Sequence, residues 1–247
     1  MNDSSSPCAP ASYPRTPHNP RFLRQLLPST LTALAVMVFS AAALAAEPDA
    51  QKFDPTANYS HTKLFGLEAQ GDKFVYVFDR SGSMGDDGGK PLREAKKQLL
   101  ASLAELDEHS QFYLIFYNEQ PRLFDLGNSR GRLIFATPSN KRQAENFISS
   151  VEAGGGTDHM AALSLALQQR PDVIFLLTDG EEKDDLTADD LKRIDRLNGG
   201  GTMINVIQFA AVPRPTSSLI QLAHENRGQH VFVDIKHYGE SSNAQAK

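Results

Sequence analysis

The chain has 247 residues, which is room for one ordinary domain with additional segments. Its 40% hydrophobic and 22% charged residues are typical of a globular protein and exclude a largely disordered one. The formal net charge is −5 and no basic patch or Lys/Arg run stands out, which argues against nucleic acid as a partner. Since Cys8 is the one cysteine, neither a disulfide framework nor a cysteine-based zinc site can form after it.

Residues 1–46 have the pattern of an export segment. An n-region rich in Ser and Pro, which we expect to be disordered, precedes an apolar run over 31–39 and an A-x-A end at 43–45. A cleaved signal peptide would place the protein in the periplasm, the cell envelope or outside the cell. Two other interpretations stay open. Residues 31–46 can remain as an uncleaved membrane anchor, although they are shorter than the ~20 residues that span a bilayer, or the start codon is misassigned.

The rest of the chain alternates strand and helix patterns. Residues 47–72 read as a linker with one candidate strand at 62–68 and a turn at 70–72. The apolar run 74–78 ends in Asp79 and is typical of a strand that is buried on both faces. Strands are predicted over 74–78, 111–117, 121–126, 172–177, 202–209 and 229–235, and helices over 91–106, 139–151, 158–169, 187–197 and 217–226.

This alternation predicts an α/β fold with a mostly parallel sheet and helices on both faces. Several helix ends carry local signals. Pro91 suits a first helical turn, Ser139 or Asn140 can cap the next helix, and Thr187 has an acidic residue at the capping-box spacing. The domain is predicted to cover 73–238, and residues 239–247 are predicted to be a disordered tail.

Three short polar segments each lie where a buried strand ends or a helix begins. They read Asp79-Arg80-Ser81-Gly82-Ser83, Gly154-Gly155-Gly156-Thr157-Asp158 and Leu177-Thr178-Asp179-Gly180. Ligands of open α/β sheets bind beyond the carboxyl ends of the strands, where the strand order reverses. The oxygen-bearing side chains there suit a hard cation such as Mg²⁺, with Mn²⁺ or Ca²⁺ as substitutes. The candidate metal ligands are Asp79, Ser81, Ser83, Thr157 and Asp179.

With this order and spacing, residues 73–238 resemble a von Willebrand factor A domain with a complete metal-ion-dependent adhesion site, in its exported stand-alone bacterial form. The resemblance implies a doubly wound sheet of order 3-2-1-4-5-6 with a short antiparallel edge strand, so the candidate strand at 62–68 must lie at an edge or be irregular. It also implies direct metal binding by Ser81, Ser83 and Thr157, whereas Asp79 and Asp179 act largely through waters.

The resemblance implies a divalent-metal-dependent protein-binding module, and not an enzyme, that captures an Asp or Glu carboxylate of a protein partner. Membrane contact is expected only through an N-terminal anchor. Two alternatives stay open. One is an envelope scaffold or assembly protein whose metal site is structural or vestigial. The other is a metal-assisted hydrolase, which lacks an evident general base beyond Asp79 and Asp179.

Several residues around the motifs have two interpretations. Asp158 can cap the helix that follows it or accept a hydrogen bond behind the metal ligands. His159 is either an ordinary residue of a helix start or a contact on the rim of the site. The acidic residues after the first and third motifs form either a solvated surface or a specificity rim; they are Asp86, Asp87, Glu181, Glu182, Asp184 and Asp185.

Overall fold

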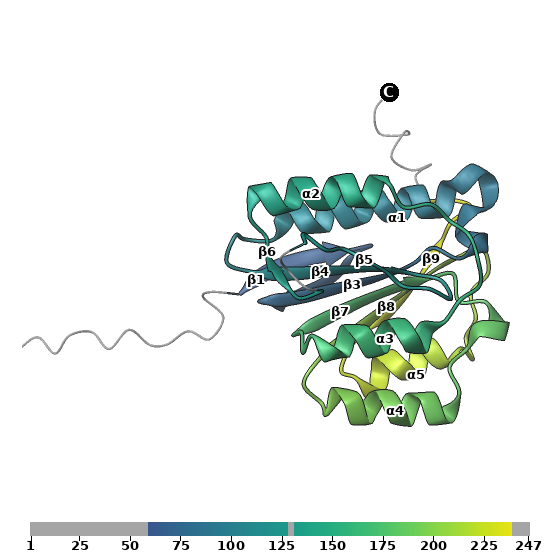
Figure 1. The fold of residues 1–247 in the computed structure, drawn as a ribbon. Helices are drawn as coiled ribbons and strands as arrows, with labels where there is room; N and C mark the ends of the chain where they lie inside the picture. Colours follow the sequence, from purple (N-terminus) through teal and green to yellow (C-terminus); the bar gives the residue numbers. More distant parts are fainter. Residues whose placement is uncertain (1–58, 128–130, 239–247) are drawn as a thin grey trace, which may run out of the picture. The chain divides into compact units, whose positions relative to one another are not determined.

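The computed structural model describes residues 59–127 and 131–238 (Figure 1). The predicted export segment, residues 47–58 of the predicted linker and the predicted C-terminal tail lie outside the described residues. Within the described part, no helix is long and apolar enough to cross a membrane.

Strands and helices alternate along the chain as the sequence predicts. The strands are β1 Ser60–Leu64, β2 Leu67–Gly71, β3 Lys73–Asp79, β4 Gln111–Tyr117, β5 Arg122–Leu123, β6 Ile134–Phe135, β7 Val173–Thr178, β8 Met203–Ala210 and β9 His230–Asp234. The helices are α1 Asp86–Glu105, α2 Pro138–Ser149, α3 His159–Gln168, α4 Ala188–Asn198 and α5 Ser218–Glu225, with short 3₁₀ turns at Gly82–Gly85 and Glu182–Asp184.

The main sheet has the order β5-β4-β3-β7-β8-β9, and β6 pairs with β4. The strands β4, β3, β7, β8 and β9 run parallel, and β5 is antiparallel at the edge. The predicted strand order and antiparallel edge strand are therefore confirmed. The sequence did not predict β6, because two residues are too few to show a pattern.

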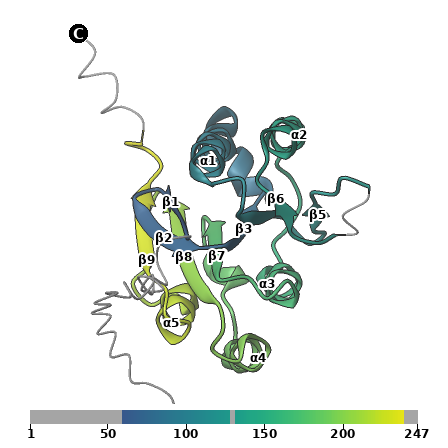
Figure 2. The ribbon, with the colours of Figure 1, turned by 90° about the vertical axis from the view of Figure 1, so that its left-hand side faces the viewer.

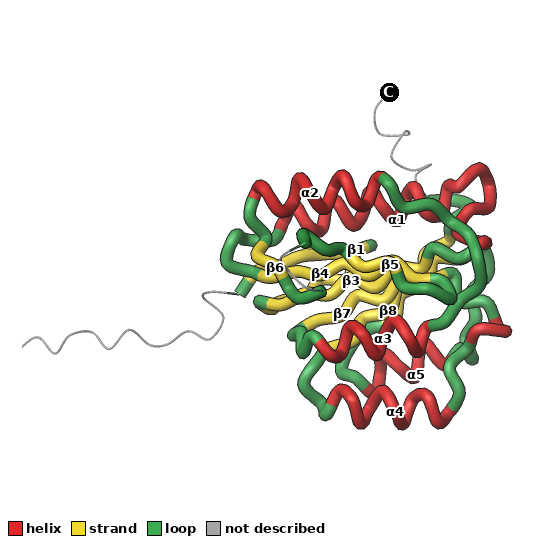
Figure 3. Tube along the Cα trace, viewed as in Figure 1, coloured by secondary structure: helices red, strands yellow, loops and turns green. Residues whose placement is uncertain are grey.

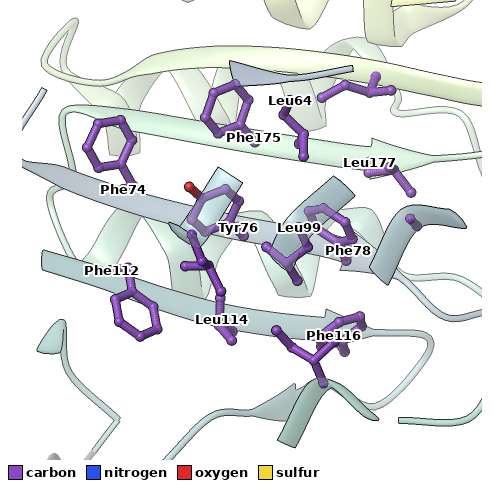
Figure 4. Packing of buried hydrophobic residues seen from close by; sticks show 14 of the residues in the cluster. Leu64, Phe74, Tyr76, Phe78, Leu99, Phe112, Leu114, Phe116, Phe175 and Leu177 are labelled. Atoms are coloured by element: carbon purple, nitrogen blue, oxygen red, sulfur yellow. The ribbon is translucent and has the colours of Figure 1, made fainter. Parts of the chain in front are cut away.

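Helices cover both faces of this sheet, so the doubly wound arrangement is confirmed. Helices α1 and α2 lie on one face and α3, α4 and α5 on the other (Figures 2 and 3). Side chains of β3 alternate between two apolar cores. Phe74, Tyr76 and Phe78 lie in the core under α1, and Figure 4 shows Leu99 of α1 near Tyr76 and Phe78. Val75 and Val77 lie in the other core. A strand between two helical layers is apolar at nearly every position.

Residues 60–71 form a β-hairpin, so the prediction of one strand at 62–68 with a turn at 70–72 was wrong. Strands β1 and β2 pair only with each other, and the turn lies at Phe65 and Gly66, whose φ angles are 48° and 82°. Two-residue turns with positive φ are the favoured hairpin connections, and Asn-Gly is their usual sequence signal. Phe-Gly lacks that signal, which is why the turn was not predicted.

The hairpin is part of the domain and not a linker. Leu64 and Leu67 belong to the core under α1. The Thr62 hydroxyl donates to the Ser102 carbonyl of α1 at 2.9 Å, and the Ser102 hydroxyl lies 2.8 Å from the Tyr76 hydroxyl of β3. Because Thr62 is buried, separating the hairpin from α1 would break its hydrogen bonds to Ser102 and uncover the Ser102–Tyr76 pair. The hairpin therefore belongs to the same compact unit as the residues that follow it.

One helix start differs from the prediction, and two agree with it. Thr137 caps α2 by accepting from the Asn140 N–H at 3.3 Å, so the cap precedes both predicted candidates. Pro138 then takes the first helical position, where its missing N–H costs nothing. In α1, residues 87–89 have positive φ, so the regular helix begins after them with Pro91 in its first turn, as predicted. The capping box at Thr187 is confirmed.

Gly228 ends α5 at a point where the chain approaches β8 closely. Its N–H donates to the Ala223 carbonyl at 2.9 Å, and a Cβ at this position would overlap the Ile204 carbonyl of β8. We predict that Gly228→Ala lowers the free energy of unfolding by at least about 2 kcal/mol, measured by chemical denaturation.

Gly201→Ala is the matched control, because a Cβ there meets only the Asn198 carbonyl at 3.5 Å. We expect its free energy of unfolding to stay within about 0.5 kcal/mol of the natural protein. Equal losses in both variants would contradict the role of close approach at Gly228.

Candidate metal centre

The three polar segments meet at the carboxyl edge of the sheet. Asp79 is the last residue of β3, and β3 pairs with β7, which ends at Thr178. Two backbone hydrogen bonds join the first segment to the glycine loop. The Gly82 N–H donates to the Gly155 carbonyl at 2.9 Å, and the Gly154 N–H donates to the Arg80 carbonyl at 2.8 Å. The sheet order and these bonds thus bring the first segment to the other two, which follow it by about 75 and 100 positions in sequence.

Asp79 is fully buried and holds the first and third segments together. One carboxylate oxygen accepts the Ser81 N–H at 2.7 Å, and the other accepts the Thr178 hydroxyl at 2.6 Å. Burial raises the pKa of Asp79 to about 6; the hydrogen bonds oppose this shift and the nearby Asp179 charge adds to it. The carboxylate is therefore a structural link as well as a source of negative charge.

The two serine hydroxyls have the spacing of neighbouring metal ligands. Ser81 Oγ and Ser83 Oγ lie 3.3 Å apart, and Ser81 is buried. Octahedral Mg²⁺ binds oxygen at about 2.1 Å, so adjacent ligands lie roughly 3 Å apart. The pair therefore fits two adjacent positions around such an ion.

Asp179 follows β7 directly and is half-buried beside Ser83. Burial raises the pKa of its carboxyl, the Ser83 hydrogen bond lowers it, and the charges of Glu181 and Asp184 raise it. Among the described residues, no three His, Cys, Asp or Glu side chains cluster as a metal site. The donor set here is instead two carboxylates with hydroxyls, which suits a hard, oxygen-seeking cation.

Thr157 stands at the end of the glycine loop, directly before α3. It is half-buried, and its hydroxyl makes no hydrogen bond within the described part of the chain. Asp158 caps α3 by accepting from the Ala161 N–H at 2.9 Å, so the cap interpretation is confirmed. The cap fixes the direction in which the chain leaves Thr157.

His159 does not lie on the rim. It is 3% exposed, and its Nδ1 lies 2.8 Å from the hydroxyl of the buried Tyr117. Burial lowers the pKa of His159 to about 4, so the ring is neutral at pH 7. The interpretation as an ordinary residue of the helix start therefore holds.

The acidic residues near the site differ in their surroundings. Asp86 and Asp87 are exposed at the start of α1. Asp185 accepts from the Arg214 guanidinium at 2.5 Å and from the Ser217 hydroxyl at 2.9 Å. Asp185 therefore joins the segment after β7 to the start of α5, and it is not part of a merely solvated surface.

Asn118 is a residue of the site that the sequence reasoning missed. It is 7% exposed; its amide nitrogen donates to the Gly154 carbonyl at 2.6 Å, and its amide oxygen accepts from Arg80 at 3.1 Å and from the Gln120 N–H at 2.8 Å. Its own carbonyl accepts from the Asp158 N–H at 3.2 Å. One signal was available, because Asn118 directly follows the buried strand β4 at the same sheet edge as Asp79.

A family model described as von Willebrand factor type A domain matches residues 74–241. Inter-alpha-trypsin inhibitor heavy chain H4 of Homo sapiens is 29% identical over 129 residues, which are 47% of this chain and 13% of that protein. The uncharacterized protein YfbK of Escherichia coli K12 is 26% identical over 179 residues, which are 68% of this chain and 29% of that protein. The chain therefore spans less than a third of the length of these curated relatives.

Solved structures show the same fold. The von Willebrand factor type A protein from Catenulispora acidiphila matches with a TM-score of 0.58 at 20% identity, over 72% of this chain and 43% of that one. Proximal thread matrix protein 1 from the mussel byssus, with a zinc occupied MIDAS motif, matches with a TM-score of 0.54 at 16% identity, over 70% and 46% of the two chains.

We predict that Asn118→Ala weakens divalent-metal binding about tenfold, because the glycine loop before Thr157 loses its side-chain support. The measurement is Mn²⁺ titration followed by electron paramagnetic resonance. Asn140→Ala is the matched control, since Asn140 donates to the Phe135 carbonyl far from the site. Unchanged Mn²⁺ affinity in a folded Asn118→Ala variant would exclude a positioning role for Asn118.

Proposed function

The chain belongs to the von Willebrand factor type A family, and on that premise we propose that it is a divalent-metal-dependent protein-binding module. Ser81, Ser83 and Thr157 would hold the cation directly, with Asp79 and Asp179 behind them. When bound, the cation supplies an open position for a carboxylate oxygen from an Asp or Glu of a protein partner. The observation that carries the proposal is the 3.3 Å separation of Ser81 Oγ and Ser83 Oγ beside two carboxylates.

The surroundings of Asp79 support an indirect role for its carboxylate. Each of its two oxygens already accepts a hydrogen bond, from the Ser81 N–H and the Thr178 hydroxyl. Neutral hydroxyls as direct ligands leave most of the charge on the cation uncompensated. An anionic partner group is then attracted more strongly than at a site with several direct carboxylates.

Binding, and not catalysis, is the role that these residues support. Asp79 is held in place by two hydrogen bonds, and the Ser83 hydroxyl lowers the pKa of Asp179. We propose Mg²⁺ as the cation, with Mn²⁺ or Ca²⁺ as substitutes. The mussel protein with a zinc occupied MIDAS motif supports metal binding at this position of the fold. The export pattern over residues 1–46 supports a site of action in the cell envelope or outside the cell.

We predict that Thr157→Ala weakens Mn²⁺ binding by at least about tenfold, whereas Thr157→Ser, which keeps the hydroxyl, stays close to the natural affinity.

In a pull-down from envelope extract, we expect the natural chain to retain its partner in Mg²⁺ and to release it in EDTA. We expect the Thr157→Ala variant not to retain the partner in Mg²⁺. A partner that is retained equally under all three conditions would exclude metal-dependent capture and favour the scaffold alternative.

We predict that Asp179→Asn stabilises the fold in EDTA, because it removes a negative charge near Asp79 and Glu181. The free energy of unfolding rises by up to about 1 kcal/mol, and the thermal unfolding midpoint rises with it. Mg²⁺ then raises the midpoint of the natural chain but not that of the variant. Asp195→Asn, at an exposed position of α4, serves as the matched control. A Mg²⁺-induced shift that persists in Asp179→Asn would place the cation elsewhere. Differential scanning fluorimetry measures all of these midpoints.

A further inference from the structure

A pocket of about 650 Å³ adjoins the candidate metal centre. Ser83 and Asp179 line one end of it. The remaining wall is largely apolar and comes from α1, the end of β8 with the segment that follows, and the end of β9; its apolar residues are Pro91, Phe209, Ala210, Ala211, Val212 and Ile235. A volume of this size falls in the range of pockets that enclose organic ligands, and it exceeds what one carboxylate needs.

Val212 gives this pocket an accessible apolar surface. It is 64% exposed, more than the other large hydrophobic residues that are exposed in the described part of the chain, which are Tyr59, Phe135 and Leu197. Phe209, which is only 1% exposed, also lines the pocket. A single exposed apolar residue is ordinary on a protein surface. Here it lines the same concavity as two residues of the metal centre.

The charges around the pocket restrict what can enter. Arg214 lies in its wall, but its guanidinium is bound to the Asp185 carboxylate and the Gly180 carbonyl. Asp86, Asp87 and Glu181 also line the pocket, and together with Asp179 they outnumber the positive charges of Lys236 in the wall and of Lys183, which pairs with Glu181. A cation at the centre attracts one carboxylate of a partner, whereas further carboxylates of the same partner are repelled by these acidic side chains. A partner with one carboxylate beside an apolar side chain complements this surface better than an acidic run.

From this arrangement, and resting on the proposed function, we infer that the pocket is a second subsite for the protein partner. It takes one large apolar side chain, such as Leu, Ile, Phe or Met, that lies a few residues from the metal-bound Asp or Glu in the same partner segment. Burying such a side chain contributes about ten- to a hundredfold in affinity. The metal centre would then supply anchoring and the pocket would supply selectivity among carboxylate-bearing segments.

The first experiment selects displayed peptides with one central Glu and random flanking positions on the full chain in Mg²⁺, and elutes them with EDTA. We expect a large apolar residue to be enriched at a fixed spacing from the Glu. We also expect Asp and Glu to be depleted at the neighbouring positions. EDTA-released peptides without an apolar preference would overturn the subsite and leave the metal-dependent function intact.

The second experiment measures a selected peptide against Val212→Asn by fluorescence polarisation in Mg²⁺. We expect about tenfold weaker peptide binding with unchanged Mn²⁺ affinity, because Val212 lies in the pocket and not among the metal-binding residues. Leu197→Asn is the matched control, since Leu197 is 47% exposed on α4 and does not line this pocket. Equal peptide affinity in the natural chain and Val212→Asn would overturn the proposal.

Two further outcomes separate the proposals. If no peptide is released by EDTA although Mn²⁺ binds, metal-dependent capture of a carboxylate fails, and the subsite, which depends on it, fails with it. A second outcome has three parts: the full chain self-associates in Mg²⁺, Val212→Asn abolishes this association, and no peptide is selected. These results together would mean that a second copy of the chain occupies the pocket. That result overturns the partner segment as the occupant.

Discussion

The candidate site depends on one buried carboxylate. Asp79 ends β3, and its two oxygens accept hydrogen bonds from the backbone of the next loop and from Thr178 at the end of β7. An anion this deeply buried is stabilised only if its oxygens are paired, and here the pairing partners are the segments that carry the other oxygen donors. The same interaction therefore satisfies a buried charge, aligns two strands at their carboxyl ends and sets the serine hydroxyls side by side.

Much of this arrangement could be predicted from the sequence, because strands buried on both faces are apolar at nearly every residue. The runs ending at Asp79 and Asp179 marked the sheet edge, and polar residues just beyond them marked the site. The helix cap at Asp158 was one of the two interpretations that its place after the glycine loop allowed. These predictions rest on interactions between residues close in sequence, or on the crossover geometry that parallel strands impose.

The features that could not be predicted depend on contacts between distant segments. The place of Asn118 directly after β4 puts it at the right edge of the sheet, but its contact with the glycine loop forms only when that loop folds over the end of the strand. The β1–β2 hairpin turns at Phe-Gly instead of a common turn sequence, and its stability comes from Ser102 and the apolar surface of α1. At α2 the signal is local: Pro138 suits the first helical position, so Thr137 becomes the cap. For Asn118 and the hairpin, tertiary contacts outweigh the local signal.

The hairpin also fixes the end of the sheet at which the described chain enters the domain. Ser60, where β1 begins, lies within hydrogen-bonding distance of Ser110, which immediately precedes β4. The parallel strands start at that end of the sheet, whereas Asp79 and Asp179 lie at the opposite end. Changes in the sequence before Ser60 are therefore separated from the candidate metal centre by the full length of the central strands.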